Sequence, residues 1–191
     1  MTDGIQKLEQ DLTVLAAMAE QMDAYLQNDI LFGKMEQGGM PMLTLGGYLL
    51  RQHRLLALSE LLSEAEQRRL ETAVIQFNTA LVEKIVRFES KAETEVAARI
   101  RQFAAYLHDL GRGQATGMNY GTAVEPRAMI AALRDKLQMK PYHLDPQIPR
   151  RVETLDNNLR QHWVTGEFIW PEAWQPAYPP DEFWWLYGKP N

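Results

Sequence analysis

Apolar residues recur every three or four positions through the middle of the chain, between residues 63 and 110. They are Leu70, Val74, Phe77, Leu81, Ile85, Phe88, Ala92, Val96, Ile100, Phe103, Leu107 and Leu110. The mean repeat of about 3.6 residues is that of a straight α-helix, so one apolar stripe faces one core. Ser63 and Glu66 have capping-box spacing at the start, and Gly111 follows the last apolar position. The pattern predicts one central helix over about residues 63–110, roughly 70 Å long at ~1.5 Å per residue.

The polar residues of this segment form oppositely charged pairs four positions apart, among them Glu64 with Arg68 and Glu95 with Arg99. Pairs with this spacing are typical of a solvated helix face. Between residues 89 and 95 the apolar stripe is reduced to Ala92. A bend or local fraying is therefore expected there if the helix is interrupted at all. The sequence leaves the continuity of the helix through residues 89–95 open.

Two further helices are predicted before this segment. The first has a heptad seam, because its apolar residues are separated alternately by three and four positions. These residues are Ile5, Leu8, Leu12, Leu15, Ala19, Met22 and Leu26. The second helix extends from a cap at Thr44 to about Leu62 and is apolar on nearly all sides, so we expect it to be buried. Gly46 and Gly47 lower helix propensity in its first turn and favour a later start.

Two amphipathic helices are predicted after the central segment. One begins near Pro126, because proline is favoured in the first turn of a helix, and the other follows Asp145 and Pro146. The short link around Lys140 and Pro141 predicts an antiparallel hairpin that covers the C-terminal half of the central helix. No segment shows the alternation of apolar and polar residues that is typical of a β-strand.

The last 27 residues, Thr165 to Asn191, differ in composition from the rest of the chain, since they contain eight aromatic residues and five prolines. Such a segment does not form a long helix, and its aromatic side chains favour burial. We expect an extended arm, residues 165–191, that packs on a helical domain formed by residues 1–164. The alternative is a docking arm or an aromatic platform for a ligand. The tryptophans that would serve it are Trp170, Trp174, Trp184 and Trp185.

The fold prediction is all-α: a five-helix bundle built on one long central helix, with an irregular aromatic and proline-rich C-terminal arm.

Charge and composition bear on partners and location. Lysine and arginine number 20 against 25 acidic residues, and the formal net charge of −5 is unfavourable for binding nucleic acid. The chain has no cysteine, which excludes disulfides and thiolate chemistry and fits a reducing compartment. No basic leader precedes an apolar run, and no apolar run approaches ~18 residues. We therefore expect a cytoplasmic protein with no membrane partner and no nucleic-acid partner.

The four histidines do not have the spacing of known catalytic or metal motifs. In helical bundles a carboxylate-bridged metal site needs a glutamate three residues before the histidine. The corresponding positions hold Leu50, Ala105, Lys140 and Leu159. Neither a His-Glu-x-x-His motif nor a Gly-x-Ser-x-Gly nucleophile turn is present. The sequence therefore predicts no catalytic residue, no metal site and no cofactor.

A polar cluster interrupts the apolar second helix at residues 51–54. Its two arginines must reach the surface or pair with carboxylates, and Glu71 and Glu83 are candidate partners. Guanidinium groups also bind carboxylate and phosphate in a fork geometry. The cluster is therefore the candidate anion-binding site, formed by Arg51, His53 and Arg54.

The absence of a catalytic motif and the long central helix favour a non-enzymatic interaction or scaffold protein with a possible protein partner. The alternative is a ligand-binding or enzymatic helical bundle, with a pocket near the arginine cluster that the aromatic arm roofs. A helix of about 70 Å with short companions leaves apolar surface uncovered, and such surface generally marks interfaces. We therefore also expect a homodimer.

Overall fold

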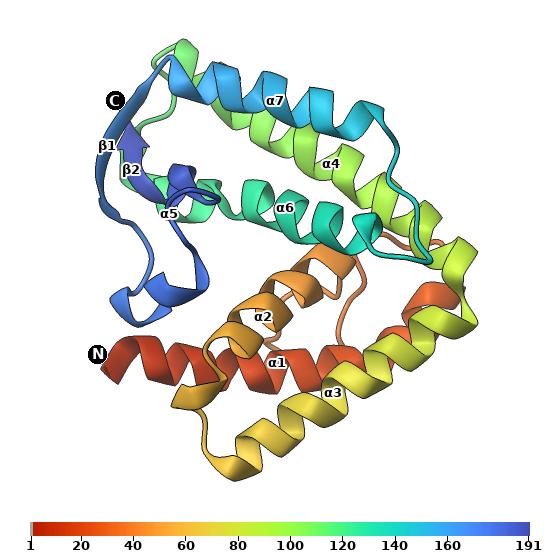
Figure 1. The fold of residues 1–191 in the computed structure, drawn as a ribbon. Coiled ribbons are helices and arrows are strands. Elements are labelled where there is room, and N and C mark those ends of the chain that lie inside the picture. Colours follow the sequence, from red (N-terminus) through yellow and green to blue (C-terminus); the bar gives the residue numbers. More distant parts are fainter. Residues whose placement is uncertain (1) are drawn as a thin grey trace.

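Seven α-helices form most of residues 2–191, the part of the chain that the computed structural model describes (Figure 1). They are α1 (Thr2–Gln27), α2 (Leu45–Ala57), α3 (Glu64–Glu83), α4 (Ile85–Gly111), α5 (Tyr120–Ala123), α6 (Glu125–Gln138) and α7 (Gln147–Arg160). Two short strands, β1 (Trp163–Phe168) and β2 (Tyr187–Pro190), pair antiparallel near the C-terminus. The mostly helical fold is as predicted. The strand pair is an addition that the sequence pattern did not indicate.

The predicted central helix over residues 63–110 is two helices, so that prediction is wrong. Helix α3 ends at Glu83 and α4 begins at Ile85, because Lys84 leaves the helical conformation at φ −135° and ψ 42°. The two helices diverge sharply at this point (Figure 1). The Lys84 ammonium pairs with Asp23 of α1. Residues 89–95, where a bend was expected, lie inside the continuous α4.

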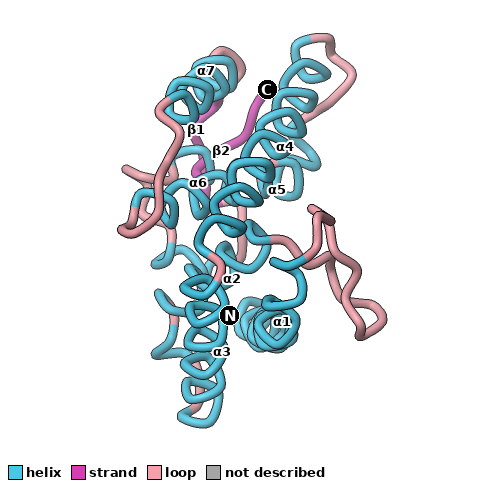
Figure 2. The backbone as a smooth tube through the Cα atoms, turned by 90° about the vertical axis from the view of Figure 1, so that its right-hand side faces the viewer, coloured by secondary structure: helices cyan, strands magenta, loops and turns pink. Residues whose placement is uncertain are grey.

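The break at Lys84 allows one apolar stripe to cover two groups of helices. Helix α3 packs along α1, whereas α4 packs against α6 and α7. Helix α2 lies between the groups and contacts α1, α4 and α6. Figures 1 and 2 show α1 and α3 at one end of the molecule, α4 and α7 at the other, and α2 crossing the space between them. One continuous hydrophobic core joins both groups. None of the helices within the described residues is long and apolar enough to cross a bilayer.

Helix α2 begins earlier than predicted, and Gly46 in its first turn lies close to α4 and α6. The Thr44 cap is confirmed, since its Oγ1 accepts a hydrogen bond of 2.9 Å from the Gly47 N–H. The predicted later start is wrong, because the helix includes Gly46 from its first turn. A Cβ atom at Gly46 would lie 2.7 Å from Glu95 Oε1 and 3.0 Å from Met129 Cβ. Glycine at this position therefore allows α2 to contact α4 and α6 directly.

Glu95 and Arg99 form a buried ion pair at this contact, and the predicted solvated face is wrong for them. The Glu95 side chain is fully buried. Its Oε1 accepts from Arg99 Nε and Nη2, each at 3.1 Å, and its Oε2 accepts from the Gly46 N–H at 3.0 Å. Arg99 Nη2 also donates to Thr44 Oγ1 at 3.2 Å. The pair thus connects α4 to the start of α2. The equivalently spaced Glu64 and Arg68 are exposed, as predicted.

The C-terminal segment lies across both groups of helices (Figure 1). Its Tyr178 and Leu186 side chains are fully buried in the common core. Trp174 Nε1 donates to the Gly4 carbonyl of α1 at 3.0 Å, and Trp170 Nε1 donates to the Gly121 carbonyl of α5 at 2.9 Å. Strand β1 crosses residue 165, so the division into domains 1–164 and 165–191 stays a prediction.

Candidate functional site

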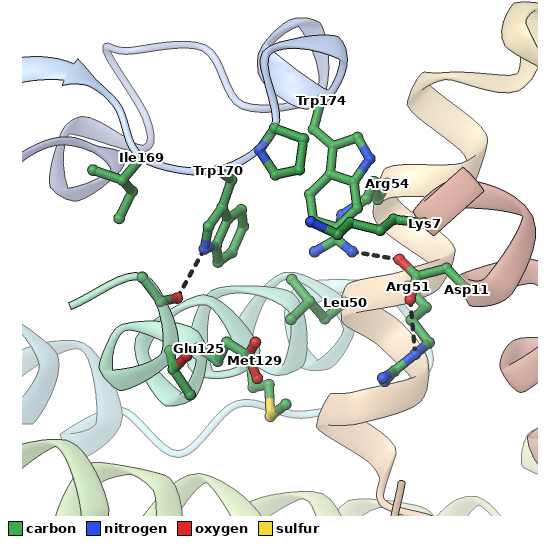
Figure 3. A pocket seen from close by; sticks show the side chains of 13 residues that line it. Lys7, Asp11, Leu50, Arg51, Arg54, Glu125, Met129, Ile169, Trp170 and Trp174 are labelled. Atoms are coloured by element: carbon green, nitrogen blue, oxygen red, sulfur yellow. Dashed lines mark hydrogen bonds and ion pairs between the residues drawn. The ribbon is translucent and has the colours of Figure 1, made fainter. Parts of the chain in front are cut away.

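A pocket of about 390 Å³ opens where α1, α2, α5, α6 and the C-terminal segment meet (Figure 3). This volume lies in the range of sites that bind small molecules. The lining residues are Lys7, Asp11, Leu50, Arg51, Arg54, Gly121, Thr122, Glu125, Met129, Ile169, Trp170, Pro171 and Trp174. The pocket therefore combines charged side chains with indole rings and aliphatic side chains.

Two arginines on α2 share one carboxylate on α1. Arg51 Nε lies 3.2 Å from Asp11 Oδ1, and Arg54 Nη1 donates to Asp11 Oδ2. Side-chain exposure is 19% for Arg51 and 7% for Arg54, so both charges are largely removed from water. The predicted partners Glu71 and Glu83 are wrong: both lie on exposed positions of α3, whereas Asp11 faces α2.

Arg54 fixes the C-terminal segment in place. Its Nε donates to the Tyr178 hydroxyl at 3.1 Å, and its guanidinium carbon lies 3.6 Å from the centroid of the Trp174 ring. A cation over an indole face contributes about 0.5–2 kcal/mol, with the larger values in desolvated sites. The guanidinium of Arg54 is therefore already occupied by protein groups on several sides.

Arg51 has unused hydrogen-bonding capacity. Its Nη1 donates to the Gly47 carbonyl at 2.8 Å, while its Nε faces Asp11. Within residues 2–191, no hydrogen bond engages its Nη2. Burial lowers the pKa of the Arg51 guanidinium and Asp11 opposes that shift, but arginine stays protonated in proteins. The group is therefore a positioned cation with a free donor.

Glu125 lies at the start of α6 and also lines the pocket. Glu125 is an exposed residue, although neighbouring protein atoms partly desolvate its carboxyl group. Among the described residues, no cation lies within ion-pair distance of its carboxylate. Burial raises the pKa of the Glu125 carboxyl group, and the charges of Arg51 and Arg54 partly oppose this. The positive charges of Arg51 and Arg54 therefore compensate the negative charge of the ionised Glu125 carboxylate only in part.

The structure brings together four of the seven residues predicted for a site. Arg51, Arg54, Trp170 and Trp174 all line the pocket. His53 lies outside it: its Nε2 is 2.8 Å from the Ala177 carbonyl oxygen, and its ring lies between Tyr178 and Phe183. Positions 51 and 54 share a helix face, whereas position 53 points elsewhere. Helical spacing alone could have separated His53 from the arginines.

The other two predicted tryptophans cover arginines away from the pocket. The Trp185 ring lies 3.7 Å from the guanidinium carbon of Arg127, which also pairs with Asp156. The centroid of the Trp184 ring lies 3.8 Å from the guanidinium carbon of Arg160. These contacts attach the C-terminal segment to α6 and α7. Trp184 and Trp185 therefore have structural contacts with the helices.

Sequence reasoning missed Lys7, Asp11, Glu125 and Met129, which come from α1 and α6. No local motif marks them, because they reach the pocket only through the packing of helices distant in sequence. Within the described residues, no three His, Asp or Glu side chains are grouped so that they could hold a metal ion. The lining side chains can bind and orient a charged small molecule through cations, one carboxylate and aromatic faces.

The chain as a whole matches no protein-family model, no curated protein sequence and no solved structure.

Proposed function

We propose that the chain binds a small molecule with a carboxylate or phosphate group in the pocket beneath Trp170 and Trp174. The observation that carries this proposal is Arg51, a residue that lines the pocket. Its guanidinium is held in place by Asp11 and Gly47 and keeps a free Nη2 donor. A preorganised guanidinium can bind an anion through a charge-assisted hydrogen bond without a large cost in side-chain entropy.

The charge balance of the pocket supports an anionic ligand. Its lining contains three cations, Lys7, Arg51 and Arg54, against two carboxylates, Asp11 and Glu125, which leaves one positive charge. An anionic group of the ligand would neutralise this excess inside a partly desolvated site, where hydrogen bonds to charged groups contribute about 1.5–3 kcal/mol. The aliphatic and indole walls would hold the apolar part of the ligand.

The test is a comparison of small anions in thermal-shift and calorimetric titrations. Butyrate, benzoate and inorganic phosphate are the probes. We expect at least one to raise the melting temperature saturably, because a ligand that binds only the folded state stabilises it. Arg51→Gln should weaken that affinity at least about tenfold, since a charge-assisted hydrogen bond is lost.

Arg101→Gln is the matched control, because Arg101 is an exposed arginine of α4 outside the pocket. This variant should keep the affinity of the unchanged protein. Arg54 is a poorer choice for substitution, since it also anchors Tyr178 and Trp174. If no anion binds, or if Arg51→Gln and Arg101→Gln behave alike, the proposal is wrong.

A second candidate is an interaction protein that forms a homodimer. The uncovered 70 Å helix that motivated this expectation is absent, because α3 and α4 separate at Lys84. An apolar group of side chains nevertheless remains exposed around that bend: Ile75 at 59%, Val82 at 65% and Val86 at 77%. Ile75 and Val82 are seven residues apart on one face of α3. A cytoplasmic location and a protein partner stay predictions.

We expect this group of side chains to pair two copies of the chain, because exposed apolar surface favours association. Light scattering should give about twice the monomer mass of 22.0 kDa, and Val82→Asp should return the monomer. Met118→Asp is the control, since Met118 is also exposed, at 88%, but follows α4 in the chain and lies outside this group. A mass of 22.0 kDa at every concentration would contradict the homodimer.

A further inference from the structure

We propose that the ligand of this pocket is zwitterionic, with a cationic nitrogen that Glu125 binds while its anionic group contacts Arg51. The chemical class is an amino carboxylic acid or a related ammonium carboxylate. This inference rests on the proposed anion-binding function and adds the second charge of the ligand.

Glu125 and the cationic side chains occupy different walls of the pocket. Lys7 and Asp11 come from α1, and Arg51 and Arg54 come from α2 (Figure 3). Glu125 comes from α6, on the far side of Leu50 in the same view. A ligand that spans the pocket from α2 to α6 therefore meets a cationic group at one end and a carboxylate at the other.

The two carboxylates of the pocket differ in their partners. Asp11 is engaged by both Arg51 and Arg54. Glu125 has no ion pair with any described residue, although it lies in the same pocket. Asp11 alone therefore supplies the carboxylate that pairs with Arg51 and Arg54, and Glu125 is not needed for this pairing. Its carboxylate remains available for a group that the protein itself does not supply.

A lone carboxylate would weaken a pocket that served only to bind anions. It repels a second negative charge, and the partial desolvation of the exposed Glu125 carboxyl group makes that repulsion stronger than in bulk water. An unpaired charge of this kind selects against ligands that cannot neutralise it. The dipole of α6 stabilises a carboxylate in the first turn of the helix. This stabilisation does not depend on whether the helix start lines a pocket. The position of Glu125 in a pocket is explained by a ligand cation.

An aromatic face accompanies this carboxylate. Trp170 lines the pocket, and its Nε1 donates to the carbonyl of Gly121, four residues before Glu125. The indole N–H is therefore satisfied by protein, and the ring is held near the start of α6. Indole rings attract ammonium groups through their faces, with quaternary ammonium as the best-known ligand. Carboxylate and indole together suit a cationic nitrogen.

Matched probes separate the two charges of the ligand. Butyrate, butylamine and 4-aminobutyrate share one carbon chain, and 5-aminopentanoate and 6-aminohexanoate vary the distance between the charges. Calorimetry and ligand-observed NMR would measure their affinities for the full chain. We expect at least one of the three amino acids to bind at least tenfold more tightly than butyrate.

Glu125→Gln should remove this tenfold advantage while leaving the affinity for butyrate unchanged or higher. A variant that merely damaged the fold would weaken all probes, so the opposite responses of acid and amino acid are diagnostic. Glu125→Asp keeps the charge and should retain part of the advantage. Glu153→Gln on the exposed face of α7 is the matched control and should change neither affinity.

The outcomes distinguish this inference from the proposed function. If butyrate binds through Arg51 but the amino acids bind no more tightly, the ligand is a simple anion and the zwitterion is excluded. If Glu125→Gln leaves the advantage intact, Glu125 is not the site of the cation and the inference fails. If neither acids nor amino acids bind, both the inference and the anion-binding function are wrong.

Discussion

Deletion of residues 165–191 should lower the melting temperature severely and increase aggregation. The deleted segment contributes Tyr178, Phe183, Trp185 and Leu186 to the buried core. Each aromatic side chain buries about 150–250 Å². At ~25 cal/mol per Å², their burial contributes on the order of 10 kcal/mol before the entropy of ordering the chain. That amount is comparable to the whole stability of a typical domain, about 5–15 kcal/mol.

Calorimetry and static light scattering would check this prediction. Single-residue variants would measure how much individual side chains of the segment contribute to stability. Trp185→Ala should lower the free energy of unfolding by about 3–5 kcal/mol, since Trp185 is buried over Arg127. The prediction is contradicted if the truncated chain keeps its melting temperature and the tryptophans of the intact chain fluoresce like indole in water. The segment would then be a free docking peptide rather than part of the core.

Glu95→Ala should lower the free energy of unfolding by about 3–5 kcal/mol, because it leaves the buried guanidinium of Arg99 without its carboxylate. The Gly46 N–H loses its acceptor in the same variant. Urea unfolding followed by circular dichroism would measure the change. The paired replacement Glu95→Leu with Arg99→Met should cost less than Glu95→Ala alone, since no charge is then left unpaired.

The chain contains its own control for this experiment. Glu64 and Arg68 have the same residue types in the same order and spacing, but their side chains are 90% and 71% exposed. Glu64→Ala should therefore change stability by less than about 0.5 kcal/mol. Equal losses for Glu64→Ala and Glu95→Ala would show that burial of the second pair does not matter energetically.

Local signals in the sequence predicted the helices well where the stabilising contacts are themselves local. The capping box at Ser63 and Glu66 and the cap at Thr44 form as expected. Helix α6 includes Pro126 in its first turn, and α7 buries Ile148 and Val152 as predicted. Each of these features depends on residues three or four positions apart, which the sequence displays directly.

The break at Lys84 could not be predicted from periodicity. Leu81, Ile85 and Phe88 keep helical spacing across it, and neither glycine nor proline marks the position. The reason for the break lies in tertiary packing, because Leu81 and Phe88 are both buried in the common core while α3 and α4 pack on different helices. A stripe that suits one straight helix also suits two shorter helices that turn toward different partners.

The candidate site was predictable only in the part that one helix supplies. Arg51 and Arg54 stood out because charges interrupt an apolar helix. Asp11 and Glu125 are ordinary polar residues of other amphipathic helices, and only the packing of α1 and α6 around α2 places them at the same pocket. Likewise, the charge pattern of α4 did not separate the buried Glu95 from the exposed residues near it.

The hydrogen bond from Trp174 to Gly4 has a consequence for when the pocket first exists. It joins positions 170 residues apart in the chain. At a translation rate of about 5–20 residues per second, the synthesis of Gly4 and that of Trp174 are separated by on the order of 10–30 s. Lys7 and Asp11 leave the ribosome before Trp170 and Trp174. A nascent chain can pair Asp11 with Arg51 and Arg54 early, but the pocket can enclose a ligand only after Trp170 and Trp174 have been synthesised and have left the ribosome.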